Sequence, residues 1–177
     1  MNDVRFQYRI YAIRGGDRVP HHENDVADSY IGMVDAEFDE LIAFLLTIQS
    51  GVLFFCNAGK DRTGVVAAAL LYKLGMCHDY IVDDYMKSKV NLEPVLHEYA
   101  KQNPAIDIQV ITPQKRYIEG FLNWYHDREM QKSQASMKLG FSRYINPVRT
   151  FRIAAAASDD FLALGRLADG EQEAAVL

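Results

Sequence analysis

The sequence predicts an α/β protein with a parallel sheet flanked by helices. Residues 52–55 form a short apolar run directly after Gly51, which is typical of a strand buried on both faces. A glycine-containing loop follows at residues 56–62, and residues 63–74 then predict a helix with apolar side chains on every side. In a sheet built from such units, the ligand site lies beyond the carboxyl end of a strand.

The region before this unit predicts one strand and one long helix. Residues 6–13 alternate apolar and polar side chains and are rich in aromatic and β-branched residues, so we expect a strand that ends at Arg14. Residues 19–28 are polar and turn-like, which indicates a loop. Ser29 is a suitable N-cap for a helix in which apolar residues recur at helical spacing up to Ile48.

Three more helices are expected after residue 75. Asp79 can cap a helix over residues 80–89, and Pro94 can open a helix over residues 95–102. Thr112 and Pro113 can open a third helix over residues 114–125. Residues 128–177 have only weak patterning, so we assign no firm structure there. The expected organisation is therefore one domain in residues 1–127 and a tail in residues 128–177.

Length and composition limit the classes of function. The 177 residues suffice for one domain with a sizeable core and a tail. The net charge of -5 argues against non-specific binding of nucleic acid, which needs clustered Lys and Arg. No apolar run reaches the ~18 residues of a membrane span, and the first residues show no secretory signal. We therefore expect a soluble, cytoplasmic protein, and the oligomeric state is left open.

The strongest chemical signal is the loop that begins at Cys56. The chain has two cysteines, too few for a disulfide framework, so the surroundings of each decide its chemistry. The six backbone amides after Cys56 can curl around one anion, because Ala58 and Gly59 are small. Arg62 at the start of the next helix can bind two oxygens of a phosphate, and the same field favours a Cys56 thiolate.

Two neighbours of Arg62 complete a set of groups for phosphoryl transfer. Thr63 can donate its hydroxyl to the thiolate, and Asp61 can protonate the departing oxygen. This chemistry requires no metal and no cofactor. The adjacent His-His-Glu residues at 21–23 could be offered as metal ligands, but adjacent side chains in a polar loop are more often solvated.

Other interpretations of the loop fit less well. A cysteine at the end of an apolar strand is most often a core residue, but the joint order of Cys, Ala, Gly, Lys, Asp, Arg, Thr and Gly is hard to explain by packing. Asp61 follows Gly59 and Lys60 where a Walker loop needs Ser or Thr. Residues 14–16 lack the spacing of a dinucleotide-binding fingerprint.

The run from Cys56 to Gly64 contains Cys-x5-Arg-Thr and closely resembles the loop of the atypical bacterial protein tyrosine phosphatases that also act on phosphoinositides. Residues 30–33, 74–75 and 83–85 resemble the same family, over roughly residues 6–127. The resemblance implies that Cys56 is the nucleophile, Asp61 the acid and Arg62 the phosphate-binding residue. It implies substrate binding by the other loop residues, with Lys60 widening the range to phosphoinositides: Asn57, Ala58, Gly59, Lys60, Thr63 and Gly64.

The sequence departs from the family pattern at two places, which affect the expected reactivity of Cys56 and the expected number of strands. Phe55 stands where the family normally has a His before the nucleophile, which predicts weaker thiolate formation. The family also has further strands ahead of the region matched by residues 6–13, and only two strands are expected here. The resemblance therefore implies a partial protein-tyrosine-phosphatase-like fold that lacks its N-terminal strands, the carboxyl-terminal portion of a catalytic domain.

The leading hypothesis is a phosphatase that acts on phosphotyrosine, and also on phosphoserine, phosphothreonine or phosphoinositides, through a cysteinyl-phosphate at Cys56. Its expected partners are phosphorylated proteins or phosphoinositides. An alternative is a non-catalytic phosphate-binding module or a fragment, which Phe55 and the missing strands favour. A rhodanese-like sulfurtransferase is a third possibility, but residues 60–63 match that class less well.

Overall fold

The computed structural model of the chain describes residues 6–15, 19–49, 51–138, 153–154 and 172–176. Within these residues the helices and strands alternate in the amino-terminal half, and helices dominate from residue 61 to residue 138. The elements follow one another in this order: β1 (Phe6–Ile10), η1 (Glu23–Asp25), α1 (Val26–Ile31), α2 (Ala36–Leu45), β2 (Gly51–Phe55), α3 (Asp61–Lys73), α4 (His78–Gln102), α5 (Ile108–Ile111), α6 (Lys115–Lys138), β3 (Ile153–Ala154) and β4 (Gln172–Val176).

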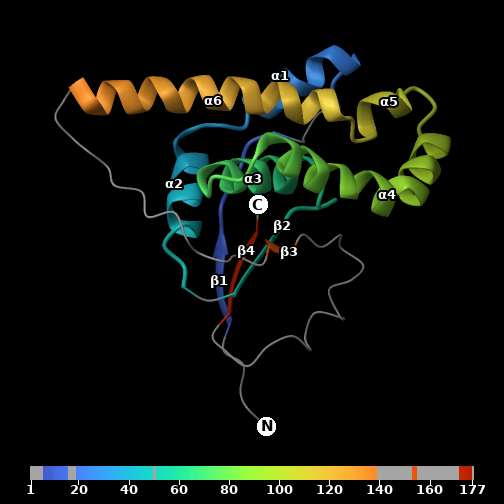
Figure 1. The fold of residues 1–177 in the computed structure, drawn as a ribbon. Helices are drawn as coiled ribbons and strands as arrows, with labels where there is room; N and C mark the ends of the chain where they lie inside the picture. The colour runs from blue at the N-terminus through green and yellow to red at the C-terminus, as the bar shows by residue number, and fades with distance from the viewer. Residues whose placement is uncertain (1–5, 16–18, 50, 139–152, 155–171, 177) are drawn as a thin grey trace, which may run out of the picture.

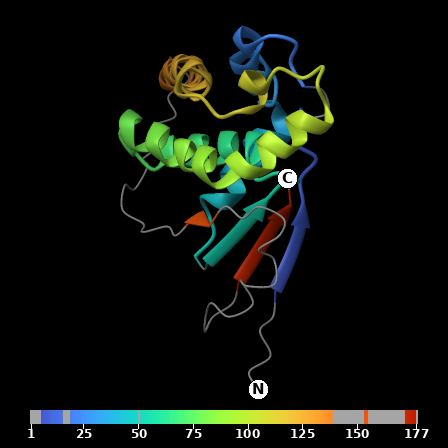
Figure 2. The same cartoon turned by 90° about the vertical axis from the view of Figure 1, so that its right-hand side faces the viewer.

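The strands lie on one side of the molecule and the helices on the other, with the carboxyl ends of β1, β2 and β4 directed toward the helices (Figures 1 and 2). The strand order is β1-β4-β2-β3, and every pairing is parallel. The strands β1 and β2 therefore do not pair with each other, because β4 lies between them. The sequence predicted β1 and β2 but neither β3 nor β4. Of the predicted tail, residues 139–152, 155–171 and 177 lie outside the described residues.

The first helical segment is broken where the sequence predicted one continuous helix. The helix α1 ends at Ile31, and α2 begins after Asp35, whose carboxylate accepts a hydrogen bond from the backbone N–H of Phe38 at 3.0 Å. This contact satisfies an N–H that has no partner inside the helix, so it favours a new helix start at this point. The apolar spacing continues across the break because both helices face the same core.

The later helices also differ from the prediction. The helix α4 runs unbroken through Pro94, where two helices were expected. Pro94 lies on an exposed side of α4, so water can reach the backbone carbonyl that a proline leaves without a donor. The helix α6 continues to Lys138, well past the predicted end at residue 125, and the domain boundary expected at residue 127 falls inside it. The short helix α5 was not predicted.

The helix α3 lies at the centre of the helical half. Its residues 65–71 are all buried, as expected for a helix that is apolar on every side. It contacts β2 and the helices α1, α2, α4 and α6. The prediction of a buried helix directly after the Cys56 loop is therefore confirmed. None of the described helices is long and apolar enough to cross a membrane.

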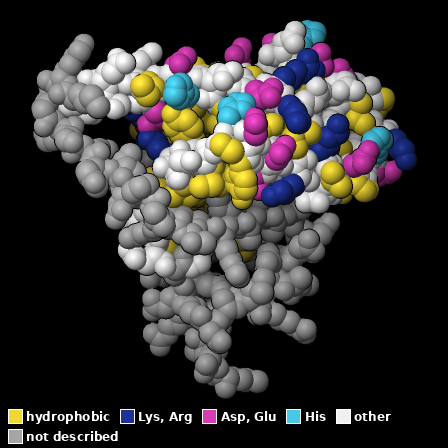
Figure 3. Space-filling view, viewed as in Figure 1, with side chains coloured by type: hydrophobic (Ala, Val, Ile, Leu, Met, Phe, Trp, Pro, Cys, Tyr) yellow, Lys and Arg dark blue, Asp and Glu magenta, His cyan; other side chains and the backbone are white. Residues whose placement is uncertain are grey.

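Acidic and basic side chains are interspersed over the helices on the face shown in Figure 3. Several of them pair, including Lys87 with Asp84 on α4 and Lys73 of α3 with Glu129 of α6. Positive charge therefore does not gather into one large patch on this face, which agrees with the negative net charge.

Candidate active site

The loop of residues 56–60 connects the carboxyl end of β2 to the first residue of α3. Cys56 directly follows β2, is 6% exposed and is not part of a disulfide. Gly59 has a φ of 64°, a left-handed conformation that favours glycine over residues with a side chain. The helix α3, which has thirteen residues, begins only five positions after Cys56. Helix N-termini favour anions, so the start of α3 can help to bind a phosphate at this loop.

Asp61, the first residue of α3, has a carboxylate held by one hydrogen bond and one ion pair. The hydroxyl of Tyr30 donates to Oδ1 of Asp61 at 2.7 Å. The amine of Lys60 pairs with the same oxygen at 3.0 Å. The Asp61 side chain is 31% exposed, so it remains open to solvent on one side.

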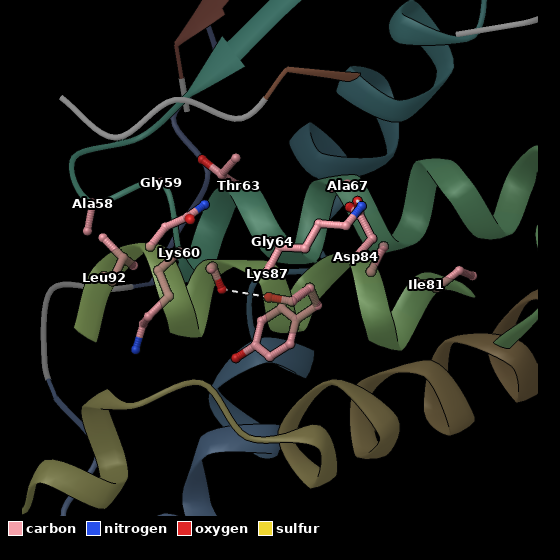
Figure 4. A pocket seen from close by; sticks show the side chains of 14 residues that line it. Ala58, Gly59, Lys60, Thr63, Gly64, Ala67, Ile81, Asp84, Lys87 and Leu92 are labelled. Atoms are coloured by element: carbon pink, nitrogen blue, oxygen red, sulfur yellow. Dashed lines mark hydrogen bonds and ion pairs between the residues drawn. The ribbon is translucent and has the colours of Figure 1, made fainter. Parts of the chain in front are cut away.

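Lys60 is buried although it carries a charge. Its amine donates to the backbone carbonyl of Ile111 at 2.7 Å, at the end of α5. Together with Asp61, this carbonyl provides the partners that a buried ammonium group needs. Figure 4 shows the Lys60 side chain leading away from Thr63. An ammonium group has three hydrogens, so these two partners leave one hydrogen for a further acceptor.

A pair of buried tyrosines stands behind the Asp61 carboxylate. The hydroxyls of Tyr30 and Tyr85 are 2.8 Å apart, and both side chains are at least 95% buried. Burial raises the pKa of Tyr30 well above its usual value, and it also raises the pKa of Tyr85. Gly64 leaves room for this pair, since a Cβ there would lie 3.0 Å from the Tyr85 ring. Neither tyrosine was predicted from the sequence to have a role in the site.

The remaining predicted residues of the first α3 turn are placed differently. Arg62 is half-buried and makes no hydrogen bond or ion pair with the part of the chain that the structure describes. Thr63 is fully buried, and its hydroxyl has no hydrogen-bond partner among the described residues. The predicted hydrogen bond from Thr63 to the sulfur of Cys56 is therefore not made in this structure.

A cavity of about 310 Å³ lies beside the loop, between α3 and α4 (Figure 4). The predicted substrate-binding residues Ala58, Gly59, Lys60, Thr63 and Gly64 line it. Cys56, Asp61, Arg62 and Asn57 do not, so the cavity adjoins the predicted catalytic residues without containing them. Its opposite wall comes from α4.

The described residues contain no group of three or more His, Cys, Asp or Glu side chains that could hold a metal ion. The His-His-Glu run at residues 21–23 therefore does not form such a group. Tyr30, Tyr85 and Ile111 are the site residues that sequence reasoning missed. They belong to α1, α4 and α5, and nothing in the local pattern of those segments indicates contact with residues 60–61.

The strand, the cysteine loop and the buried helix together define an α/β protein with a candidate site at the carboxyl end of a strand. The sequence profile of the tyrosine phosphatase family matches residues 7–141. The chain therefore belongs to the tyrosine phosphatase family, whose members are phosphatase hydrolases.

Three curated relatives carry phosphatase names. The chain is 31% identical to a tyrosine-protein phosphatase of Nostoc commune over 101 residues, which cover 51% of this chain and 34% of the relative. It is 47% identical to the triple specificity protein phosphatase of Mycobacterium tuberculosis over 47 residues, 27% of this chain and 17% of the relative. A putative tyrosine-protein phosphatase of Cupriavidus necator is 49% identical over 47 residues, 25% of this chain and 17% of the relative.

The chain thus spans about a third or less of the length of these relatives. No solved structure matches the chain.

Proposed function

We propose that the chain is a cysteine-dependent phosphatase that acts on phosphotyrosine, with Cys56 as the nucleophile. The observation that carries the proposal is the run from Cys56 to Gly64, placed between β2 and the N-terminus of α3. Membership of the tyrosine phosphatase family supports it. In this proposal the loop amides and the positive end of the α3 dipole hold the phosphate dianion.

In the first step, the sulfur of Cys56 attacks phosphorus, and the bond from phosphorus to the substrate oxygen breaks. Asp61 gives its proton to that departing oxygen. Arg62 neutralises charge on the non-bridging oxygens of the phosphate. Its half-buried side chain is available for this contact, because it makes no hydrogen bond or ion pair with the described residues. The products are the free hydroxyl of the substrate and a cysteinyl-phosphate.

In the second step, water attacks the phosphorus of the cysteinyl-phosphate. Asp61, now a carboxylate, accepts a proton from this water, and the sulfur leaves as a thiolate. Inorganic phosphate is released and the starting state of Cys56 is restored. The carboxylate of Asp61 thus acts first as an acid and then as a base, and its partial exposure leaves room for both reactants.

The proposed substrate range extends to phosphoserine, phosphothreonine and phosphoinositides. The name of the Mycobacterium tuberculosis relative attributes triple specificity to that protein. The resemblance of the loop, including Lys60, supports the same extension for this chain. The buried position of the Lys60 amine predicts that any effect on substrate range acts partly through Asp61, its ion-pair partner.

Turnover of a small aryl phosphate by matched cysteine variants tests the proposal. Cys56→Ser should abolish turnover, because a serine hydroxyl is a far weaker nucleophile than a thiolate. Cys77→Ser is the control, since Cys77 is exposed and lies at the start of α4, away from the loop. Equal rates for the Cys56→Ser variant and the unsubstituted chain would refute the proposal.

A non-catalytic phosphate-binding module is the second candidate. Phe55 in the place of a His and the unpartnered hydroxyl of Thr63 favour it, because both predict weaker support for a thiolate. This candidate predicts binding of a phosphate analogue without formation of a phosphoenzyme. A single-turnover burst from the purified chain would eliminate it.

A further inference from the structure

We propose that Tyr30 is a positioning residue for the acid Asp61. In this proposal, Tyr30 and Lys60 hold Oδ1 of Asp61, so that Oδ2 carries the proton that is given to the substrate. The inference rests on the proposed function, because it concerns the acid of that same reaction. Tyr30 itself does not touch the reacting atoms and acts only through the Asp61 carboxylate.

The geometry distinguishes the two oxygens of Asp61. Tyr30 donates to Oδ1 at 2.7 Å, and Lys60 lies 3.0 Å from the same atom. No hydrogen bond or ion pair joins Oδ2 to any of the described residues. The hydrogen bond and the ion pair both occupy Oδ1, so Oδ2 is the oxygen left to carry the proton of the acid. The fixed oxygen also sets the direction in which Oδ2 points.

The direction of the hydrogen bonds follows from the chemistry of the hydroxyls. A tyrosine hydroxyl has one hydrogen, and Tyr30 gives its hydrogen to Asp61. Tyr85, 2.8 Å away, must therefore donate to the oxygen of Tyr30. Burial raises the pKa of both tyrosines, so they stay protonated and remain donors across the pH range of an enzyme assay.

Four separate segments hold this arrangement in place. Tyr30 comes from α1 and Tyr85 from α4, while Lys60 and Asp61 open α3. Ile111 of α5 fixes the Lys60 amine through its carbonyl. The Tyr30 side chain is 1% exposed and its ring packs edge-on against Tyr85, so its hydroxyl cannot swing away from Asp61 without disturbing the core. The carboxylate is therefore oriented by the fold before a substrate binds.

A proton donor matters more when the leaving group is more basic. Phenol resembles tyrosine, with a pKa of about 10, and needs protonation as it departs. Para-nitrophenol is much more acidic and can leave as an anion with little help. A variant with a poorly oriented acid should therefore lose activity mainly toward phenyl phosphate, whereas a general loss of structure should affect both substrates equally.

The experiment compares kcat/KM of Tyr30→Phe for phenyl phosphate and para-nitrophenyl phosphate in the full chain. The value of kcat/KM reports the step in which the phosphorus–oxygen bond breaks. We expect kcat/KM to fall roughly tenfold with phenyl phosphate and less than about threefold with para-nitrophenyl phosphate. The tenfold loss is smaller than the roughly 10²–10⁴-fold that a general acid contributes, because Asp61 is still present in the variant. Tyr125→Phe is the matched control, because it removes a buried tyrosine hydroxyl that has no hydrogen-bond partner in the part of the chain that the structure describes.

A double-mutant cycle with Asp61→Asn separates positioning from a structural role. Asn at position 61 cannot donate the proton as an acid, so Tyr30→Phe should cause no further preferential loss with phenyl phosphate in that background. Tyr85→Phe, which removes the donor to Tyr30, should show a smaller preference of the same sign, and it serves as the test if Tyr30→Phe does not fold.

Equal losses for the two substrates, or no loss for either, would overturn the inference. An undiminished preference in the Asp61→Asn background would also overturn it. These results differ from failure of the proposed function, which would appear as unchanged turnover in Cys56→Ser.

Discussion

At the scale of single residues, Gly59 and Lys60 are compatible with a stable fold, whereas the buried hydroxyl of Thr63 is unfavourable to it. Gly59 adopts a left-handed conformation at little cost, and Lys60 has two partners for its buried charge. Thr63 is the exception, because its buried hydroxyl has no hydrogen-bond partner within the described segments. A buried hydroxyl without a hydrogen bond opposes folding, so a functional role is the natural explanation for its presence.

Thr63→Val tests this explanation. Since the hydroxyl has no partner to lose, we expect the free energy of unfolding in urea to stay the same or to rise by up to about 1 kcal/mol. Turnover should nevertheless fall by about tenfold, the equivalent of one lost hydrogen bond to the Cys56 sulfur during the reaction. Unchanged turnover would show that Thr63 has no part in the reaction, and a large loss of stability would show that its hydroxyl has a partner.

At the scale of elements, polar side chains decide where helices start and how they are joined. Asp35 starts α2, and Asp39 of the same helix joins it to α6. Neither effect follows from the apolar spacing, which is continuous from residue 30 to residue 48. The two aspartates allow separate tests of a helix cap and of a contact between helices.

Asp35→Ala should lower the free energy of unfolding by about 1 kcal/mol, because the N–H of Phe38 loses its acceptor. Asp35→Asn keeps a side-chain oxygen at the same place and should retain most of the stability. The ion pair of Asp35 with the exposed Arg14, at 3.6 Å, contributes little to this difference. Equal losses in the two variants, measured by urea unfolding, would contradict the capping role.

The contact of α2 with α6 should give a defined dependence of stability on pH. Burial alone would raise the pKa of Asp39, but hydrogen bonds from Arg128 and Lys132 outweigh burial and lower it. The unfolded chain therefore binds the proton more readily than the folded chain does. The contact stabilises the fold above about pH 4, and this stability is lost as the pH falls through the lower pKa of the folded state.

Asp39→Asn should thus be less stable than the unsubstituted chain at pH 7, by less than about 1 kcal/mol because the carboxylate is partly exposed. The difference should shrink when unfolding is measured well below pH 4. Asp127→Asn on α6 is the control, since Asp127 is exposed and has no ion pair with the described residues. A difference that does not depend on pH would show that the charge of Asp39 is not involved.

At the scale of the whole molecule, the sheet depends on a strand near the carboxyl end of the chain. Ala175 of β4 is paired with Arg9 of β1 on one side and with Phe54 of β2 on the other. β2 leads directly into the Cys56 loop. Residues more than a hundred positions away in the sequence therefore help to hold the strand that carries the candidate nucleophile.

Ala175→Pro tests this dependence, since proline removes a backbone donor and is poorly tolerated in a central strand. We expect the free energy of unfolding to fall by at least about 2 kcal/mol, with a parallel loss of turnover. Ala175→Ser is the control, because it keeps the backbone donor at the same position and should retain the strand pairing. Equal unfolding midpoints for Ala175→Pro and the unsubstituted chain would show that β4 does not stabilise the fold.

The sequence by itself determined the parts of this protein that depend on near neighbours. The apolar run before Cys56, the glycine-containing loop and the buried helix α3 could all be predicted, because strand and helix periodicity are local patterns. The same run of residues was enough to indicate the family. The predicted roles of Cys56, Asp61 and Arg62 also come from this one segment and remain proposals.

The tertiary structure decided the features that depend on distant residues. The break between α1 and α2, the unbroken α4 and the insertion of β4 into the sheet each went against a local pattern. The contacts that hold Asp61 and Lys60 join residues 31 and 51 positions apart. Periodicity shows that a side chain is buried, but it does not show which buried side chain it meets. The support of the candidate acid by Tyr30 could therefore be found only in the folded chain.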